Sequence, residues 1–332
     1  YPIVSIEDGM AEEDRDALAY SPAGFLWDHA LAAGVSLRNY GEFCQPRVRW
    51  KDESRAGEPD FMACFEAWSG ERHDVVFGCE PVGPSLEPYS PTRYVGWNMS
   101  VPDQDRADVV LEDLAASERA GTYPALTMIC LPNDHTSGTS AGKPTPAACM
   151  ADGDLAVGRI IEGLSHSSFW PTMAVFVIED DPQAGWDHVS GYRTTAFVAS
   201  PYAHRQTRVR QQYNTTSMLR TMEQILGIPP MNQFDASASP MFECFQNEPD
   251  LRPFTARANR VPLDELNPEP SAIADPSQRA DAVASAAIDW SAMDRAPEDV
   301  LNRILWRAMR GTTAPYPEWA IDPFAEDDDD DD

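Results

Sequence analysis

The chain has 332 residues, 42% of them hydrophobic, and a formal net charge of −29. Its length suits one large core or two modest ones, because domains usually run about 50 to 250 residues. The charge argues against nucleic acid as a partner, since an acidic surface repels a phosphate backbone, and no run of about 18 apolar residues indicates a transmembrane segment.

The first part of the chain predicts a helix, a strand and then a long excursion. Residues 24–31 have helical spacing, and residues 35–43 (VSLRNYGEF) are rich in the β-branched and aromatic residues typical of a strand. Residues 45–100 are rich in Pro, Gly and charge without clear periodicity, so we expect loops over the surface. A helix over residues 105–121 follows, with Gly121 as its stop.

The middle of the chain alternates strands with helices. The helical patterns are residues 154–164 and 215–227, the second with a Thr N-cap. The alternation predicts an α/β fold with a largely parallel central sheet and helices on both faces. We expect its strands near residues 35–43, 125–131, 173–180 and 194–200.

Composition divides the chain into two regions. Residues 1–245 carry the α/β pattern, and residues 246–332 form a Pro-rich extension with a short helix over 297–311. The extension ends in six aspartates, Asp327–Asp332, a charge run that is usually a solvated tail, with calcium binding as the alternative. The six cysteines leave two interpretations open: three disulfides in an oxidising compartment, or buried free thiols.

Two polar loops follow predicted strands. Ligands of open α/β sheets bind at the carboxyl ends of the strands, so these loops should lie side by side. The first loop holds Asp134, His135 and Thr136, and the second begins with Asp180 and Asp181. Adjacent carboxylates at a strand end repel each other, which a divalent cation would relieve. The alternative is a helix cap or a solvated turn.

A family resemblance extends over most of residues 20–245. The run LPNDHTSGTSAGKPTP…MAVFVIEDDPQAGWDHVSGYRTTAFVASPY, over residues 131–202, resembles the bacterial phosphoesterase family that includes acid phosphatases and phospholipase C enzymes. That family belongs to the alkaline phosphatase superfamily. Residues 22–43 and 213–241 resemble it too. The resemblance implies an alkaline-phosphatase-like sandwich and metal-dependent hydrolysis of a phosphate mono- or diester.

The resemblance also assigns roles to residues of the two loops. It implies a divalent metal ion, of the zinc, manganese, iron, magnesium or calcium type, and a phosphate-ester substrate. The implied metal ligands are Asp180 and Asp181, and the implied catalytic residues are His135 and His188. The substrate would contact Asp134, Thr136 and Asp187.

One part of the family pattern has no match in this chain. The resemblance places the hydroxyl nucleophile upstream of residue 22, and residues 1–20 do not match, so we expect an absent N-terminal segment or a second chain to supply it. We expect a periplasmic or extracellular protein. The alternative function is a catalytically inactive domain that serves as a binding or structural subunit of an extracellular assembly. The unmatched nucleophile favours it, and so does Tyr192, which stands where close relatives commonly have His.

Overall fold

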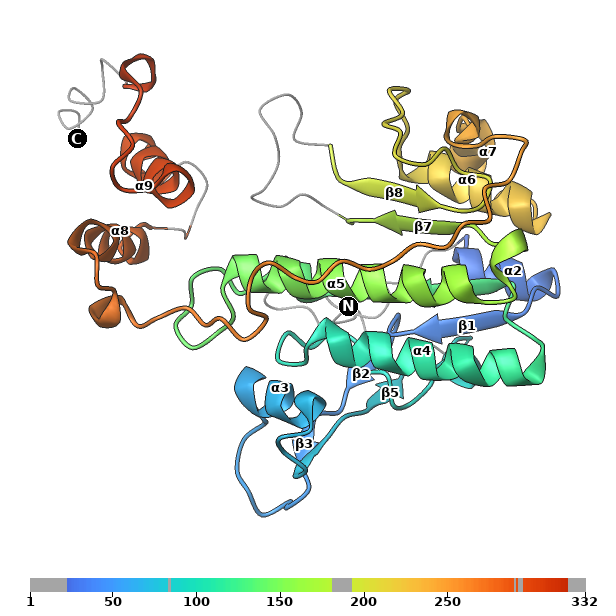
Figure 1. Ribbon diagram of the computed structural model, residues 1–332, viewed down its shortest axis with the longest axis horizontal. Helices are drawn as coiled ribbons and strands as arrows, with labels where there is room; N and C mark the ends of the chain where they lie inside the picture. The colour runs from blue at the N-terminus through green and yellow to red at the C-terminus, as the bar shows by residue number, and fades with distance from the viewer. Residues whose placement is uncertain (1–22, 83–84, 181–192, 290, 292–294, 322–332) are drawn as a thin grey trace. The chain divides into compact units, whose positions relative to one another are not determined.

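A computed structural model describes residues 23–82, 85–180, 193–289, 291 and 295–321, and it is mixed α/β (Figure 1). The α-helices of this described part are α2 (Leu26–Ala32), α3 (Phe61–Ser69), α4 (Asp103–Ala120), α5 (Pro146–His166), α6 (Thr215–Leu226), α7 (Gln233–Ser237), α8 (Pro276–Ala286) and α9 (Glu298–Arg310). The strands are β1 (Leu37–Tyr40), β2 (Cys44–Pro46), β3 (Arg49–Trp50), β4 (Val75–Val76), β5 (Cys79–Pro81), β6 (Leu126–Ile129), β7 (Val175–Ile178) and β8 (Ala196–Ala199). None of these helices is both long and apolar enough to cross a membrane.

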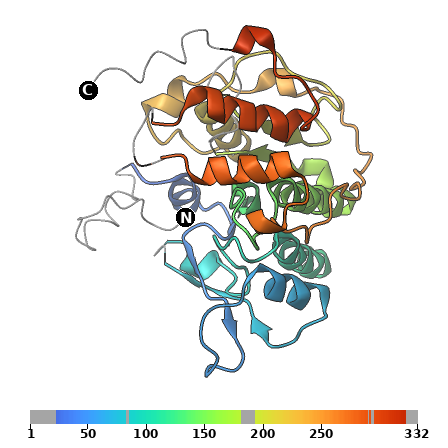
Figure 2. The same ribbon diagram turned by 90° about the vertical axis from the view of Figure 1, so that its left-hand side faces the viewer.

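The chain divides into two compact units. The first comprises the chain up to Ser137 together with Pro146–Glu265, and the second comprises Gly138–Thr145 and the chain from Leu266 onward. In the second unit, α8 and α9 lie side by side (Figure 2), joined by an ion pair between Arg307 and Asp281. The domain boundary that composition suggests at residue 245 stays a prediction.

The four strands expected around the site all exist, but they form two separate pairs. β1 and β6 pair in parallel, from Leu37 opposite Leu126 to Tyr40 opposite Ile129. β7 and β8 pair antiparallel, and no ladder joins the two pairs within the described residues. The prediction of a mixed α/β fold is therefore confirmed. The prediction of a single, largely parallel sheet is wrong for the described residues, which form separate two-stranded sheets. Antiparallel neighbours need only a chain reversal, while a parallel pair needs a crossover, and no helical pattern lies between β7 and β8.

The excursion over residues 45–100 has regular structure that we did not expect. β2 pairs with β5 and β3 with β4, both antiparallel. The helix α3 is capped by the Asp60 side chain, which accepts a hydrogen bond from the Ala63 N–H, and it ends at Gly70 with a φ of 85°. A small apolar core joins these elements: Val48, Trp50, Ala63, Cys64, Val75, Val95 and Val101. Strands of two or three residues are too short to show periodicity in a sequence.

Helices pack against both faces of the strands in the first unit. On one face, α4 and α5 share an apolar cluster against which Ile129 of β6 and Val175 of β7 pack (Figure 1). The two helices approach closely at Gly163, where an added Cβ would lie 2.4 Å from Leu111 Cδ2. On the other face, Phe176 of β7 packs against a cluster that includes Met218 of α6. Successive residues of β7 thus point to opposite faces, Val175 to the α4–α5 cluster and Phe176 to the cluster with Met218.

Two buried carboxyl groups join α6 to α7. Glu223 is fully buried and Asp235 is 1% exposed. The Met231 N–H donates to both, at 3.3 Å to Glu223 Oε1 and 2.6 Å to Asp235 Oδ2. Burial, together with the hydrogen bond to Asp235, raises the pKa of Glu223 to about 7. Arg220 Nη1, which lies 3.2 Å from Glu223 Oε2, opposes this rise, so Glu223 keeps its proton only up to about pH 7 and shares it with the carboxylate of Asp235.

This shared proton predicts a pH-dependent stability. An unfolded Glu titrates near pH 4.3, so the folded state binds this proton more tightly. Its stabilisation is complete below that pH and is lost as the pH rises through about 7. Glu223→Gln cannot titrate, so its free energy of unfolding should gain about 1–3 kcal/mol relative to wild type between pH 5 and pH 8. Urea unfolding followed by circular dichroism measures this difference.

The exposed Glu248 provides the control, because Glu248→Gln should follow the wild-type curve at both pH values. Parallel pH curves for wild type and Glu223→Gln would contradict the shared proton.

Candidate functional site

Acidic residues follow three strand ends and interact through their charges. Glu42 follows β1, Asp134 lies in the turn after β6, and Glu179 and Asp180 follow β7. Burial raises the pKa of Asp134, and the negative charges of Glu179 and Asp180 raise it further. Burial also raises the pKa of Glu42, with a contribution from Asp180. We call these four residues the strand-end acidic group.

The turn after β6 has a strained backbone. It is a short 3-10 helix, Asn133–His135, followed by Thr136 with φ 61° and ψ 167°. Such a conformation is normally adopted by glycine and costs about 1–3 kcal/mol in other residues. The His135 side chain is exposed, its Nδ1 lies 3.2 Å from the Thr136 carbonyl oxygen, and its ring meets the Trp97 ring edge-on with centroids 5.1 Å apart. Strain of this kind persists where surrounding contacts hold it, which occurs often at functional sites.

The carboxylate of Asp152, in α5, accepts the hydrogen bonds that position this turn. Its Oδ2 accepts hydrogen bonds from the Asp103 N–H and from Asn133 Nδ2, both at 2.7 Å. Its Oδ1 accepts from Gln104 Nε2 at 2.9 Å. The Asn133 N–H in turn donates to Asp103 Oδ2 at 3.2 Å. The first turn of α4, the middle of α5 and the start of the candidate loop are thus one hydrogen-bonded unit, with all four side chains at most 2% exposed.

Arg106 balances the charge of this unit. Its guanidinium is fully buried and donates to Asp103 Oδ1 at 2.9 Å and to four backbone carbonyl oxygens, those of Val95, Gly96, Asn98 and Val101. Burial nevertheless raises the pKa of Asp103 to about 7, against the lowering effect of Arg106. One polar atom is left over: Asn133 Oδ1 is buried and has no hydrogen-bond partner within the described part of the chain.

The structure brings part of the predicted site together. Asp134 and Asp180 interact, and His135 and Thr136 lie in the same turn as Asp134. Asp181, Asp187 and His188 lie outside the described residues. Sequence reasoning missed Glu42 and Glu179, because it placed both inside the predicted strands, at 35–43 and 173–180, whereas β1 ends at Tyr40 and β7 ends at Ile178.

The strand-end acidic group has the chemistry of a cation site but not a complete ligand set. Converging carboxylates with raised pKa values are stabilised by a nearby cation, and oxygen ligands suit a hard divalent ion. Among the described residues, no three His, Cys, Asp or Glu side chains lie close enough together to hold an ion. The carboxylates therefore fit a metal in charge and donor type, and the predicted ligand Asp181 lies beyond them in sequence.

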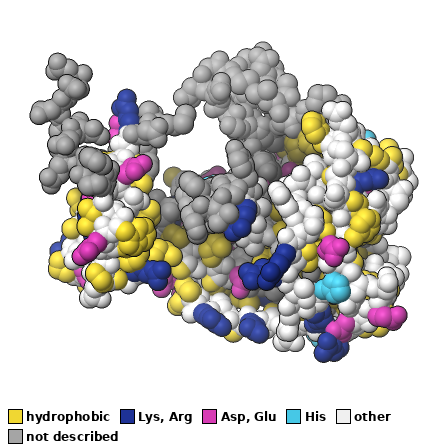
Figure 3. Space-filling model, turned by 90° about the horizontal axis from the view of Figure 1, so that it is seen from above, with side chains coloured by type: hydrophobic (Ala, Val, Ile, Leu, Met, Phe, Trp, Pro, Cys, Tyr) yellow, Lys and Arg dark blue, Asp and Glu magenta, His cyan; other side chains and the backbone are white. Residues whose placement is uncertain are grey.

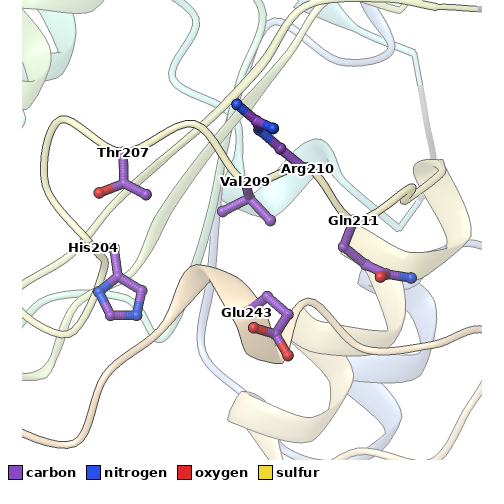
Figure 4. Close-up of a pocket in the computed structure, with 6 residues that line it drawn as sticks. All are labelled: His204, Thr207, Val209, Arg210, Gln211 and Glu243. Carbon is purple, nitrogen blue, oxygen red and sulfur yellow. The ribbon is translucent and has the colours of Figure 1, made fainter.

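A pocket of about 420 Å³ lies elsewhere in the first unit. Figure 4 shows Thr207, Val209, Arg210 and Gln211 along the segment after β8, with His204 and Glu243 completing the lining. Because β8 runs antiparallel to β7, its carboxyl end is at the opposite edge from Asp180. None of the predicted site residues lines this pocket. On the face shown in Figure 3, basic and acidic side chains are interspersed with hydrophobic ones.

Removal of the Asp152 carboxylate tests whether its hydrogen bonds stabilise the turn after β6. Asp152→Ala leaves three buried donors without their acceptor, so the free energy of unfolding should fall by about 3–5 kcal/mol. Asp154→Ala, on the exposed side of the same helix, should change it by less than about 0.5 kcal/mol. Denaturant unfolding of both variants gives the comparison, and equal losses would show that Asp152 has no special structural role.

Part of this site lies in a segment that matches a known protein family. The model of the Phosphoesterase family matches residues 89–229, which include the turn after β6, α5, β7, β8 and α6. A search of curated proteins found no match. The resemblance seen in the sequence is confirmed: residues 89–229, in the middle of the chain, match a phosphoesterase family.

Proposed function

We propose that this protein hydrolyses a phosphate mono- or diester in a metal-dependent reaction of the acid phosphatase or phospholipase C type. The family match supports phosphate-ester hydrolysis in general. The observation that carries the finer proposal is the strand-end acidic group, in which Asp180 raises the pKa values of both Asp134 and Glu42. Repelling carboxylates at the carboxyl edge of the strands favour a bound cation there.

The proposed roles follow from residue chemistry. Asp180 and Asp181 hold the divalent ion. A bound divalent ion polarises phosphoryl oxygens. His135 and His188 interact with the phosphate, and Asp134, Thr136 and Asp187 contact the substrate. The raised pKa of Asp134 suits a carboxyl group that exchanges a proton with the substrate.

The nucleophile comes, in this proposal, from an N-terminal segment or a second chain. Ile129 of β6 and Val175 of β7 pack against the same α4–α5 cluster, yet no ladder joins their strands in the described residues. Ile178 is 37% exposed and Phe197 is 60% exposed. Free strand edges and exposed apolar side chains favour cover by a further strand. Such a strand would complete an alkaline-phosphatase-like sandwich, and we place the protein in the periplasm or outside the cell.

A binding or structural subunit of an extracellular assembly is the second candidate function. Its support lies in the sequence: residues 1–20 do not match the part of the family pattern that carries the nucleophile, and Tyr192 stands where close relatives commonly have His. Such a subunit would have the same fold but no phosphoesterase activity.

Activity assays separate the two candidates. The full-length gene product should hydrolyse p-nitrophenyl phosphate or bis(p-nitrophenyl) phosphate, and a chelator should abolish the reaction. Asp180→Ala and Asp181→Ala should each lower kcat/KM by about 100-fold or more, because each removes a ligand of the ion that polarises the phosphate.

Asp154→Ala is the matched control, since it removes an exposed carboxylate of the same unit and should keep wild-type kcat/KM. Folding is checked for each variant by circular dichroism. A folded protein with neither ester hydrolysis nor sensitivity to chelation would favour the binding subunit.

A further inference from the structure

Two cysteines lie at the base of the segment between β2 and β5, one in each strand. In the antiparallel pairing of these strands, Cys44 lies opposite Pro81 and Cys79 lies opposite Pro46. Side chains two residues apart on a strand share a face, so Cys44 and Cys79 are diagonal neighbours on one face of the pair. Cys44 is 1% exposed and Cys79 is 7% exposed.

The two thiols contact each other. Cys79 is a hydrogen-bond partner of Cys44, and its Sγ also lies 3.6 Å from the Pro91 carbonyl oxygen. On the other side, Asn39 Nδ2 lies 3.9 Å from Cys44 Sγ. Both cysteines are free thiols in the structure.

The environment of Cys44 favours its thiolate. The hydrogen bond from Cys79 lowers the pKa of Cys44, and Ser90 contributes in the same direction. By contrast, burial raises the pKa of Cys149 to about 11. Since the thiolate is the form that attacks a disulfide, Cys44 is the more reactive of these thiols once solvent reaches it.

We propose that Cys44 and Cys79 are a redox site, which a small-molecule disulfide oxidises to an intramolecular disulfide at the base of residues 47–78. With oxidised glutathione, the Cys44 thiolate attacks one glutathione sulfur and releases the other as a thiolate. The Cys79 sulfur then attacks Cys44 in this mixed disulfide and releases the second glutathione. The protein loses two electrons and two protons, and glutathione disulfide gains them, so one S–S bond breaks and one forms.

A disulfide between Cys44 and Cys79 stabilises the segment between β2 and β5. The segment between the two cysteines holds α3, β3 and β4, which share an apolar core. A cross-link at its base reduces the conformational freedom of the unfolded segment. The link is also close to the candidate site, because Asn39, which contacts Cys44, donates to the Glu42 carbonyl oxygen at 2.7 Å.

Redox titration tests this proposal. The full-length protein is equilibrated in buffers of reduced and oxidised glutathione, free thiols are blocked with N-ethylmaleimide, and peptides are mapped by mass spectrometry without reduction. We expect a linked Cys44–Cys79 peptide pair under oxidising conditions. The Tm of the oxidised protein should exceed that of the reduced protein by about 5 °C or more.

Alanine variants identify the source of the shift. Cys44→Ala and Cys79→Ala should each lose both the linked peptide and the Tm difference, whereas Cys149→Ala, which removes another buried thiol, should keep both. Cys44 and Cys79 both blocked by N-ethylmaleimide in the most oxidising buffer would overturn the proposal, as would a disulfide from either one to another cysteine. These readouts do not depend on phosphoesterase activity.

Discussion

The buried hydrogen-bond network between Asp152, Asp103 and Arg106 is the constraint on which the candidate site depends. Burying carboxylates and a guanidinium is costly unless their polar atoms are satisfied. Arg106 finds one carboxylate and four carbonyl oxygens, and Asp152 accepts from a backbone N–H and two side-chain amides. The network stabilises one arrangement of α4 and α5, because few alternatives satisfy so many buried groups.

The position of the candidate loop is a direct consequence of this network. Asn133 donates to both Asp103 and Asp152, so the residues that follow it have little freedom. Asp134 is thereby held beside the negative charges at the end of β7, and Thr136 is held in a conformation that is unfavourable for a threonine. Like charges and backbone strain both cost free energy, and a bound cation or substrate would offset part of that cost.

Sequence patterns predicted those elements whose signal extends over a long enough segment, which is a run of apolar, β-branched or aromatic residues for a strand and helical spacing for a helix. Residues 35–43 and 125–131 contain β1 and β6, and residues 105–121 are nearly all in α4. The strands of the excursion have only two or three residues, which is too short for a recognisable pattern in the sequence. The α6 helix was predicted, but its N-cap is Asn214, whose Oδ1 accepts from the Ser217 N–H at 2.9 Å, where we expected Thr.

Part of the candidate site was predicted from the positions of the strand ends. Asp134 and Asp180 follow strands, and strand direction places strand ends together, so sequence alone pointed to both. The antiparallel pairing of β7 with β8 was missed, although the sequence between them has no helical pattern for the crossover that a parallel pair needs. Asp103 and Asp152 gave no signal, since charged residues within helices are usually solvated and only tertiary packing buries these two.

Binding of Mn²⁺ to the full-length gene product, followed by electron paramagnetic resonance, tests the central claim most directly. If the strand-end acidic group forms part of a cation site, the protein binds Mn²⁺ saturably, and affinity rises with pH as the carboxyl group of Asp134 loses its proton. Asp134→Asn should flatten that pH dependence, and Asp180→Asn should weaken binding by about 10-fold or more, while Asp154→Asn leaves both unchanged. Absence of saturable binding, or equal affinity in wild type and Asp180→Asn, would contradict the account.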